Sequence, residues 1–213
     1  MAYVRPQTGD LATLSGSSEP QTVKWFRVED GETVVDVGAN IGRYSLIAAR
    51  SASRVIAIEP VPSNFSMLKE NIKLNRFSHV IGLNIAVSDR AGQRNMYLTG
   101  EANATKSSLD EEWSRGVGRT DAIEVVRVDS DTLDNVVGRL GITSLDWLKV
   151  DVEGHEVHVL RGAQLTLQRT KRLIIEVARG NERSCMDLLR MGGLRIIAVE
   201  RIGRTSNWLL CRF

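Results

Sequence analysis

The sequence predicts an α/β fold in which a mostly parallel sheet is covered by helices on both faces. Three observations support this prediction. Short apolar runs alternate with longer amphipathic segments along most of the chain. The apolar runs are continuous, as expected of strands that are buried on both faces. The first of them, residues 33–37, ends in a glycine turn that opens a helical pattern. In folds of this kind, ligands bind beyond the carboxyl ends of the strands.

The first half of the chain contains three predicted strands and two predicted helices. The strands are residues 33–37, 54–59 and 80–86, and the helices are residues 41–50 and 63–75. Pro60 and Pro62 end the second strand, and Ser63 is expected to cap the second helix. Extended segments follow at residues 94–98 and 123–128.

The second half continues the same alternation and ends in a predicted hairpin. Its elements are a helix at 132–140 capped by Ser130 or Asp131, a strand at 145–152, a helix that follows a bend at Gly154 and ends near Gln168, a strand at 172–177, a helix at 181–191, and hairpin strands at 194–201 and 207–213. We expect one domain, residues 1–213, with residues 1–22 as an N-terminal arm or lid. Residues 99–122 form a long polar loop, and loops of this length are usually functional or disordered.

Composition narrows the class of protein. The net charge is +2 and no block of lysine or arginine is present, so nucleic acid is not indicated as a partner, although it is not excluded. Cys185 and Cys211 lie in apolar segments and are expected to be buried free thiols. The N-terminus lacks the apolar region of a signal peptide, and no run could span a bilayer. The expectation is a cytoplasmic enzyme without a membrane partner.

The turn after the first strand carries the first candidate site. A dinucleotide fingerprint has glycines at i, i+2 and i+5, but here the turn reads Gly38, Asn40, Gly42. That spacing argues against a pyrophosphate on the turn. Glu59 ends the second strand, where an acid accepts hydrogen bonds from ribose hydroxyls. Together they favour a ligand with an adenosine and no phosphate. The alternative is an ordinary turn with a salt-bridged Glu59.

A second polar cluster lies at the end of the strand at 145–152. Strand periodicity puts Lys149, Asp151 and, if the extended path continues, Glu153 on one side. Glu176 lies within another apolar run and also needs a partner. Ionisable groups at strand ends are costly unless they are paired or used, so this cluster indicates a site. A structural lysine–carboxylate network is the alternative.

Four motifs resemble those of the FkbM-type methyltransferases, which are class I enzymes dependent on S-adenosylmethionine (SAM). The motifs are Asp-Val-Gly-Ala-Asn-Ile-Gly at 36–42, Ile-Glu-Pro at 58–60, Ala-Val-Ser-Asp at 86–89 and Leu-Lys-Val-Asp-Val-Glu-Gly-His-Glu at 148–156. The last is the most specific, and the resemblance covers residues 34–177. It implies a Rossmann-like fold with a mostly parallel seven-stranded sheet and a C-terminal antiparallel hairpin.

The resemblance also implies which residues hold the cofactor. Asp36 would act on the methionine end of SAM, Ala86 and Val87 would flank the adenine, and Asp151 could contact the amino group. The full cofactor set implied is Asp36, Gly38, Ala39, Asn40, Gly42, Glu59, Pro60, Ala86, Val87 and Asp151.

The implied reaction is O-methylation of a hydroxyl on a small molecule or sugar. A hydroxyl must lose its proton as the bond forms, so a base with a pKa near neutrality is useful. His155 suits this role by its intrinsic pKa, Asp151 could orient the base, and Lys149 competes if burial lowers its pKa. Candidate acceptor contacts are Asn103, Ser107, Glu153 and Glu176, and no clear set of metal ligands is present.

Two other classes of function remain open on the sequence. An RNA or protein methyltransferase would be favoured by a basic surface around the cleft. The strand end at Asp151 lacks the Asn/Asp-Pro-Pro-aromatic segment of amine-directed nucleic-acid methyltransferases, which lowers that expectation. The second of these classes is a nicotinamide-dependent reductase or a noncatalytic nucleotide binder.

Overall fold

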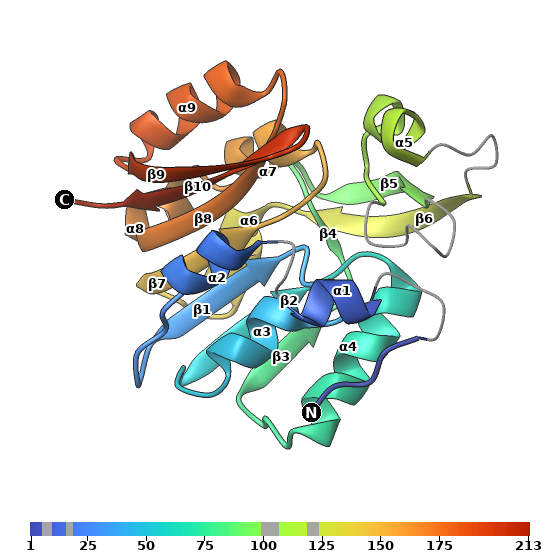
Figure 1. Ribbon diagram of the computed structural model, residues 1–213. Coiled ribbons are helices and arrows are strands. Elements are labelled where there is room, and N and C mark those ends of the chain that lie inside the picture. Colours follow the sequence, from blue (N-terminus) through green and yellow to red (C-terminus); the bar gives the residue numbers. More distant parts are fainter. Residues whose placement is uncertain (6–9, 16–18, 99–106, 119–123) are drawn as a thin grey trace.

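A seven-stranded sheet forms the centre of the computed structural model (Figure 1), which describes residues 1–5, 10–15, 19–98, 107–118 and 124–213. In sheet order the strands are β3 (Val80–Leu83), β2 (Arg54–Ile58), β1 (Thr33–Val37), β7 (Leu145–Val150), β8 (Thr170–Ala178), β10 (Thr205–Cys211) and β9 (Arg195–Ile202). Neighbours from β3 to β8 pair in parallel, and β10 pairs antiparallel with β8 and β9. The predicted fold class and hairpin are confirmed.

Helices cover both faces of this sheet (Figure 1). On one face lie α6 (Leu133–Arg139), α7 (Glu156–Arg161), α8 (Gln164–Arg169) and α9 (Glu182–Met191), and on the other lie α2 (Pro20–Trp25), α3 (Arg43–Ala48) and α4 (Pro62–Leu74). Two further helices are α1 (Asp10–Ser15) and α5 (Glu111–Gly118).

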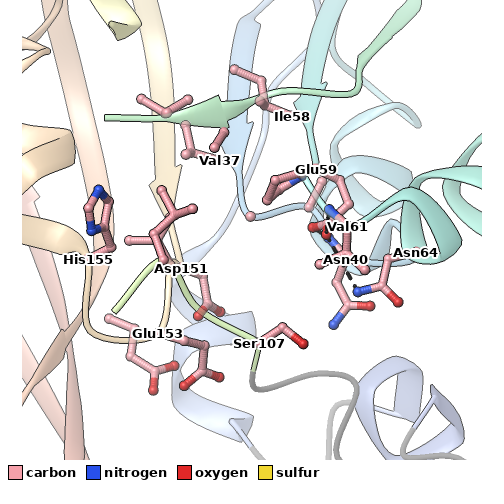
Figure 2. A pocket seen from close by; sticks show the side chains of 18 of the residues that line it. Val37, Asn40, Ile58, Glu59, Val61, Asn64, Ser107, Asp151, Glu153 and His155 are labelled. Atoms are coloured by element: carbon pink, nitrogen blue, oxygen red, sulfur yellow. Dashed lines mark hydrogen bonds between the residues drawn. The ribbon is translucent and has the colours of Figure 1, made fainter. Parts of the chain in front are cut away.

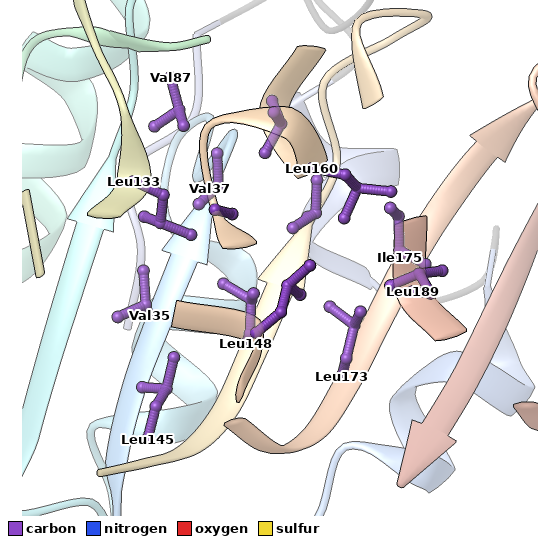
Figure 3. Packing of buried hydrophobic residues seen from close by; sticks show 14 of the residues in the cluster. Val35, Val37, Val87, Leu133, Leu145, Leu148, Leu160, Leu173, Ile175 and Leu189 are labelled. Atoms are coloured by element: carbon purple, nitrogen blue, oxygen red, sulfur yellow. The ribbon is translucent and has the colours of Figure 1, made fainter. Parts of the chain in front are cut away.

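Successive side chains of each central strand belong to two separate apolar cores, one on each face of the sheet. In β7, Leu148 packs with α6 to α9 (Figure 3), whereas its neighbour Trp147 packs with α3 and Phe26 on the opposite face. Strand geometry requires this alternation, because successive side chains point to opposite faces. The sheet is therefore buried on both sides, as its continuous apolar runs predict.

The third predicted strand, residues 80–86, extends too far at its carboxyl end. β3 stops at Leu83, and Asn84 turns the chain by donating its side-chain amide to the carbonyls of Glu59 and Pro60. Ala86 and Val87 form β4 (Ala86–Val87), which pairs with β6 (Glu124–Asp131) in a second sheet of order β4-β6-β5, where β5 is Gly92–Leu98. This small sheet stands beside the carboxyl edge of the large one (Figure 1).

Three helix boundaries also differ from the prediction. The helix expected between the bend at Gly154 and Gln168 is divided into α7 and α8 at Gly162, where a Cβ would lie 2.1 Å from the carbonyl oxygen of Ser88. α4 begins at Pro62, so Ser63 is not its cap. Thr132, rather than Ser130 or Asp131, caps α6 by accepting a hydrogen bond from the backbone of Asn135.

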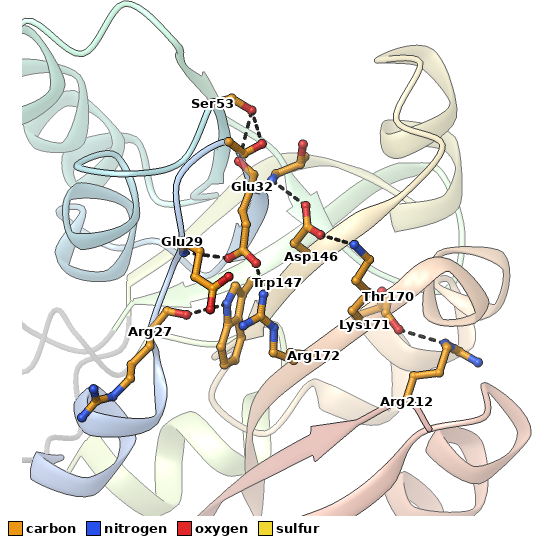
Figure 4. Close-up of polar contacts among 12 residues, drawn as sticks. Arg27, Glu29, Glu32, Ser53, Asp146, Trp147, Thr170, Lys171, Arg172 and Arg212 are labelled. Carbon is orange, nitrogen blue, oxygen red and sulfur yellow. Dashed lines mark hydrogen bonds and ion pairs between the residues drawn. The ribbon is translucent and has the colours of Figure 1, made fainter.

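Polar contacts stabilise the sheet at the amino-terminal ends of its central strands (Figure 4). The Trp147 indole donates to the carbonyl of Arg27 at 3.0 Å, and the Arg172 guanidinium lies 4.6 Å from the Trp147 ring while pairing with Glu32. Asp146 accepts from the backbone of Thr33 at 2.9 Å. These contacts occupy the amino-terminal ends of the strands, so a ligand would bind at the carboxyl ends.

In the described part of the chain, no helix is long and apolar enough to cross a bilayer. Both cysteines are free thiols: Cys185 is buried and Cys211 is partly exposed.

Candidate active site

A cavity of about 660 Å³ opens beyond the carboxyl ends of β1, β2, β7 and β8 (Figure 2). Further walls come from β4, α5, the turn between β9 and β10, and Glu19 just before α2. The cavity therefore lies at the sheet edge where open α/β folds bind their ligands.

The glycine turn brings the tips of β1 and β7 into contact. Gly38 has φ +81°, and a Cβ there would lie 1.7 Å from the carbonyl oxygen of Asp151. No other residue fits, because the backbones meet at this point. Asn40 also has a positive φ, +52°, and its backbone N–H donates to Glu59 at 2.8 Å.

Glu59 is fixed in the cavity wall at the end of β2. Its two oxygens accept from the backbone amides of Asn40 and Val61, at 2.8 and 2.9 Å, and it is 4% exposed (Figure 2). Burial raises the pKa of this carboxyl to about 7, against the lowering effect of the two amides. The side chain is thus a preoriented acceptor on the side of the cavity formed by β2.

Lys149 is the centre of an ionic cluster on the other side of β1. Its side chain is fully buried, its ammonium lies 3.0 Å from Asp151, and the same ammonium lies 5.0 Å from the Tyr44 ring centre. Burial lowers the pKa of Lys149, but the charges of Asp151, Glu19 and Glu176 outweigh burial and raise it overall. The condition on which Lys149 was expected to act as an alternative base, a pKa lowered by burial, is therefore not met.

The acids around Lys149 come from distant parts of the chain. Carboxylate oxygens of Glu19, Asp151 and Glu176 lie within 4.8 Å of one another. Burial raises the pKa of Glu176 to about 8, with the Asp151 charge adding to the effect. For Glu19, burial acts upward, but Lys149 and the Tyr44 hydroxyl lower its pKa overall. Lys149 is the cation that this cluster surrounds.

The turn after β7 positions a tryptophan in the wall. Glu153 has φ +48°, so the extended path expected through this residue stops before it. Its carboxylate accepts from the Trp113 indole at 3.2 Å, and a Cβ at Gly154 would lie 2.8 Å from the Trp113 ring. Glu156 fixes the turn from behind, because its buried carboxylate accepts from the backbone of Gly154 at 2.7 Å.

His155 lines the cavity but does not have a near-neutral pKa. It is 6% exposed, its Nε2 lies 2.9 Å from the Ser88 hydroxyl, and its ring stacks on that of His158 at 4.5 Å. Burial, and then the charges of His158 and Arg94, lower its pKa to about 3. At physiological pH the imidazole is therefore neutral, which corrects the expectation of a base poised near neutrality.

Most of the predicted site residues line this one cavity. They are Gly38, Ala39, Asn40, Glu59, Pro60, Ala86, Val87, Ser107, Asp151, Glu153, His155 and Glu176. Three predicted residues lie outside its wall: Lys149, Asp36, which accepts from the Ser45 hydroxyl at 2.6 Å below the turn, and Gly42, which packs against Leu68. Asn103 is outside the described residues.

Sequence reasoning missed several lining residues, among them Glu19, Arg43, Tyr44, Asn64 and Trp113. Arg43 and Tyr44 follow the glycine turn directly, so their place in the sequence was a usable signal. Trp113 is a large aromatic residue in a polar loop, which is also unusual. Glu19 lies in an arm with no periodic pattern, and only the folded structure brings it to the site.

This arrangement of sheet, glycine turn, strand-end acid and cavity defines a class I SAM-dependent methyltransferase. The chain belongs to the FkbM methyltransferase family: residues 36–195 match the model of the methyltransferase FkbM domain.

Known relatives agree with this assignment. The chain is 31% identical to hexuronic acid methyltransferase AglP of Haloferax volcanii over 95% of this chain and 79% of that protein. It is 30% identical to 31-O-demethyl-FK506 methyltransferase FkbM of Streptomyces tacrolimicus over 80% of this chain and 75% of the relative. The crystal structure of a methyltransferase FkbM from Methylobacillus flagellatus KT has the same fold, with a TM-score of 0.60 and 18% identity over 87% of this chain and 44% of that one.

Proposed function

We propose that this methyltransferase transfers the methyl group of SAM to a hydroxyl of a small molecule or sugar. The observation that carries the proposal is the end of the cavity away from Glu59, where the Trp113 indole donates to the Glu153 carboxylate and the carboxyl group of Glu176 also lines the wall. Carboxylates accept hydrogen bonds from hydroxyls, and an aromatic face packs against an apolar ring face. That pairing suits a compact acceptor with several hydroxyls.

The residues around the tip of β7 would serve the transfer by positioning. SAM supplies an activated methyl group on a sulfonium, so the protein has to align the hydroxyl, exclude water and receive a proton. Asp151 is held by Lys149, and neutral His155 can accept a hydrogen bond from the hydroxyl. Asp151 is the proposed proton acceptor, and His155 and Lys149 are positioning residues.

The cofactor assignment within the cavity is part of this proposal. Glu59 would accept hydrogen bonds from the ribose hydroxyls. The backbone of Gly38 and Ala39 would lie against the ribose, and Ala86 and Val87 would flank the adenine. Their common location in one wall supports this placement. The acceptor would then lie between Ser107, Glu153 and Glu176.

The N-terminal arm would help to close the cofactor side. Tyr3 donates its backbone N–H to Asn71 at 2.5 Å, and Arg5 donates to Asn64 at 2.9 Å. Asn64 is itself in the cavity wall. We therefore propose that the N-terminal arm, residues 1–22, belongs to the same single domain and acts as a lid, and that the predicted loop 99–122 borders the acceptor; residues 6–9, 16–18, 99–106 and 119–122 of these segments lie outside the described residues.

The relatives narrow the range of acceptors to test. One is named for a hexuronic acid and another for 31-O-demethyl-FK506. Purified protein with methyl-tritiated SAM should label neutral sugars, uronic acids or hydroxylated macrolides, but not total RNA or a protein extract. Labelled methyl groups should be recovered as ethers. Labelling confined to RNA or protein would contradict the proposal and favour the alternative acceptor classes.

A further inference from the structure

Arg43 is a buried cation with two unused hydrogen-bond donors. It is 6% exposed and lines the cavity. Its Nη1 donates to Glu19 at 3.3 Å, whereas Nε and Nη2 have no hydrogen-bond partner among the described residues. Leaving a buried charged donor unpaired costs free energy, so such groups are rare unless a ligand satisfies them.

The two unused donors have the geometry of a carboxylate site. In a guanidinium group, the Nε and Nη2 hydrogens lie on the same edge and point the same way. That edge forms two parallel hydrogen bonds with the two oxygens of a carboxylate. The pair with Glu19 uses the opposite nitrogen, so it orients the group and leaves this buried edge without a hydrogen-bond partner.

Arg43 lies on the side of β1 that faces β7. Glu19 connects Arg43 to the Tyr44 hydroxyl, which lies 2.7 Å from the same carboxylate, and the Tyr44 ring contacts Lys149 of β7. Glu59 ends β2, which is the other neighbour of β1. A ligand whose ribose is held by Glu59 therefore extends its far end across β1 toward Arg43.

The far end of SAM is an amino acid that carries one carboxylate and one ammonium. Among the described residues that line the cavity, the only lysines or arginines are Arg43 and Arg204. Arg204 is exposed and donates to the carbonyl of Gly116. Glu19 and Asp151 supply negative charge beside Arg43, which suits the ammonium.

We propose that Arg43 binds the methionine carboxylate of SAM through Nε and Nη2, with Glu19 and Asp151 facing the ammonium. This inference rests on the proposed placement of the ribose at Glu59. It makes Arg43 the residue that distinguishes SAM and its product S-adenosylhomocysteine (SAH) from adenosine thioethers without an amino-acid carboxylate.

Two ligands and two variants test this assignment by calorimetry. The ligands are SAH and 5′-deoxy-5′-(3-aminopropylthio)adenosine, which is SAH without its carboxylate. The wild type should bind SAH about 10- to 100-fold more tightly than the analogue, as expected of a paired charged hydrogen bond. In Arg43→Met, SAH should weaken to the level of the analogue while the analogue keeps its wild-type affinity. Arg50→Met, an exposed arginine just after α3, is the matched control and should change neither ligand.

The outcomes separate the possible failures. An unchanged preference for SAH in Arg43→Met, or an equal loss for both ligands, would overturn the inference, because the residue would then be irrelevant or merely structural. A wild type that binds neither ligand would overturn the proposed cofactor site itself. If Arg43→Met does not fold, the wild-type comparison still decides, since equal affinity for both ligands contradicts a carboxylate site.

Discussion

Glu59 is held by backbone amides on both of its oxygens, and this defines what its removal should do. Replacement by alanine leaves those amides without their acceptor and removes the proposed contact to the ribose. We expect Glu59→Ala to weaken SAH binding at least about tenfold, measured by calorimetry. Glu70→Ala, an exposed acid on α4, is the control. Equal affinity in both variants would remove Glu59 from the site.

His155 gives a second prediction at the scale of one residue. Because burial lowers its pKa to about 3, its ring should stay neutral throughout the range in which an ordinary histidine titrates. NMR of the imidazole signals should show no step between pH 5 and 8 for the signal that disappears in His155→Gln. A midpoint near 6.5 for that signal would contradict the burial described here.

The sequence predicted that residues following different strands line one cavity, because parallel strands bring their carboxyl ends to one edge. It did not predict charge states. Lys149 and His155 were both plausible bases from their types alone, yet one is surrounded by carboxylates and the other is buried beside cations. Such shifts depend on neighbours that are distant along the chain, so no local pattern carries them.

At the scale of elements, the glycine turn after β1 gives a sharp test. In Gly38→Ala the new Cβ would overlap the Asp151 carbonyl, in addition to the strain of a positive φ. We expect a loss of more than about 1 kcal/mol in unfolding free energy, together with loss of SAH binding. Denaturant unfolding and calorimetry measure the two effects.

Gly141→Ala is the matched control for that prediction. Gly141 also has a positive φ, +66°, but nothing lies within 4 Å of the position that its Cβ would occupy. It should lose stability through backbone strain alone and keep SAH binding. If both variants bind SAH normally, close approach of the β1 and β7 tips is not needed for the site.

Elements with a clear period were predicted well, and those set by tertiary contacts were not. The bounds of β1 agree with residues 33–37, since a continuous apolar run and a turn define the strand locally. β4 was hidden in the predicted third strand because its pairing partner, β6, lies some 40 residues onward. The break at Gly162 lies where the backbone meets Ser88, which is more remote still, 74 residues earlier in the sequence.

At the scale of the whole molecule, buried carboxyls should make the free protein less stable at alkaline pH. Burial raises the pKa of Asp36 to about 6, of Glu59 to about 7 and of Glu176 to about 8. The folded chain therefore binds more protons than the unfolded chain between the ordinary and raised values. By linkage, this stability is complete below about pH 4 and is lost progressively as the pH rises through the folded pKa values, up to about 8.

Glu176→Gln tests that dependence, because glutamine keeps the shape of the side chain and cannot ionise. Unfolding free energies at pH 5 and pH 8 should differ less in this variant than in the wild type, with Glu70→Gln behaving like the wild type. The same decline with pH in both variants would show that Glu176 is not protonated in the folded state.

The position of β10 has a consequence for how the protein is made. This strand comes last along the sequence but lies between β8 and β9. A nascent chain that has reached only residue 204 leaves the edge of β8 open and β9 without a neighbour. Open edges recruit other chains, so the period between synthesis of β9 and insertion of β10 is when aggregation is most favoured.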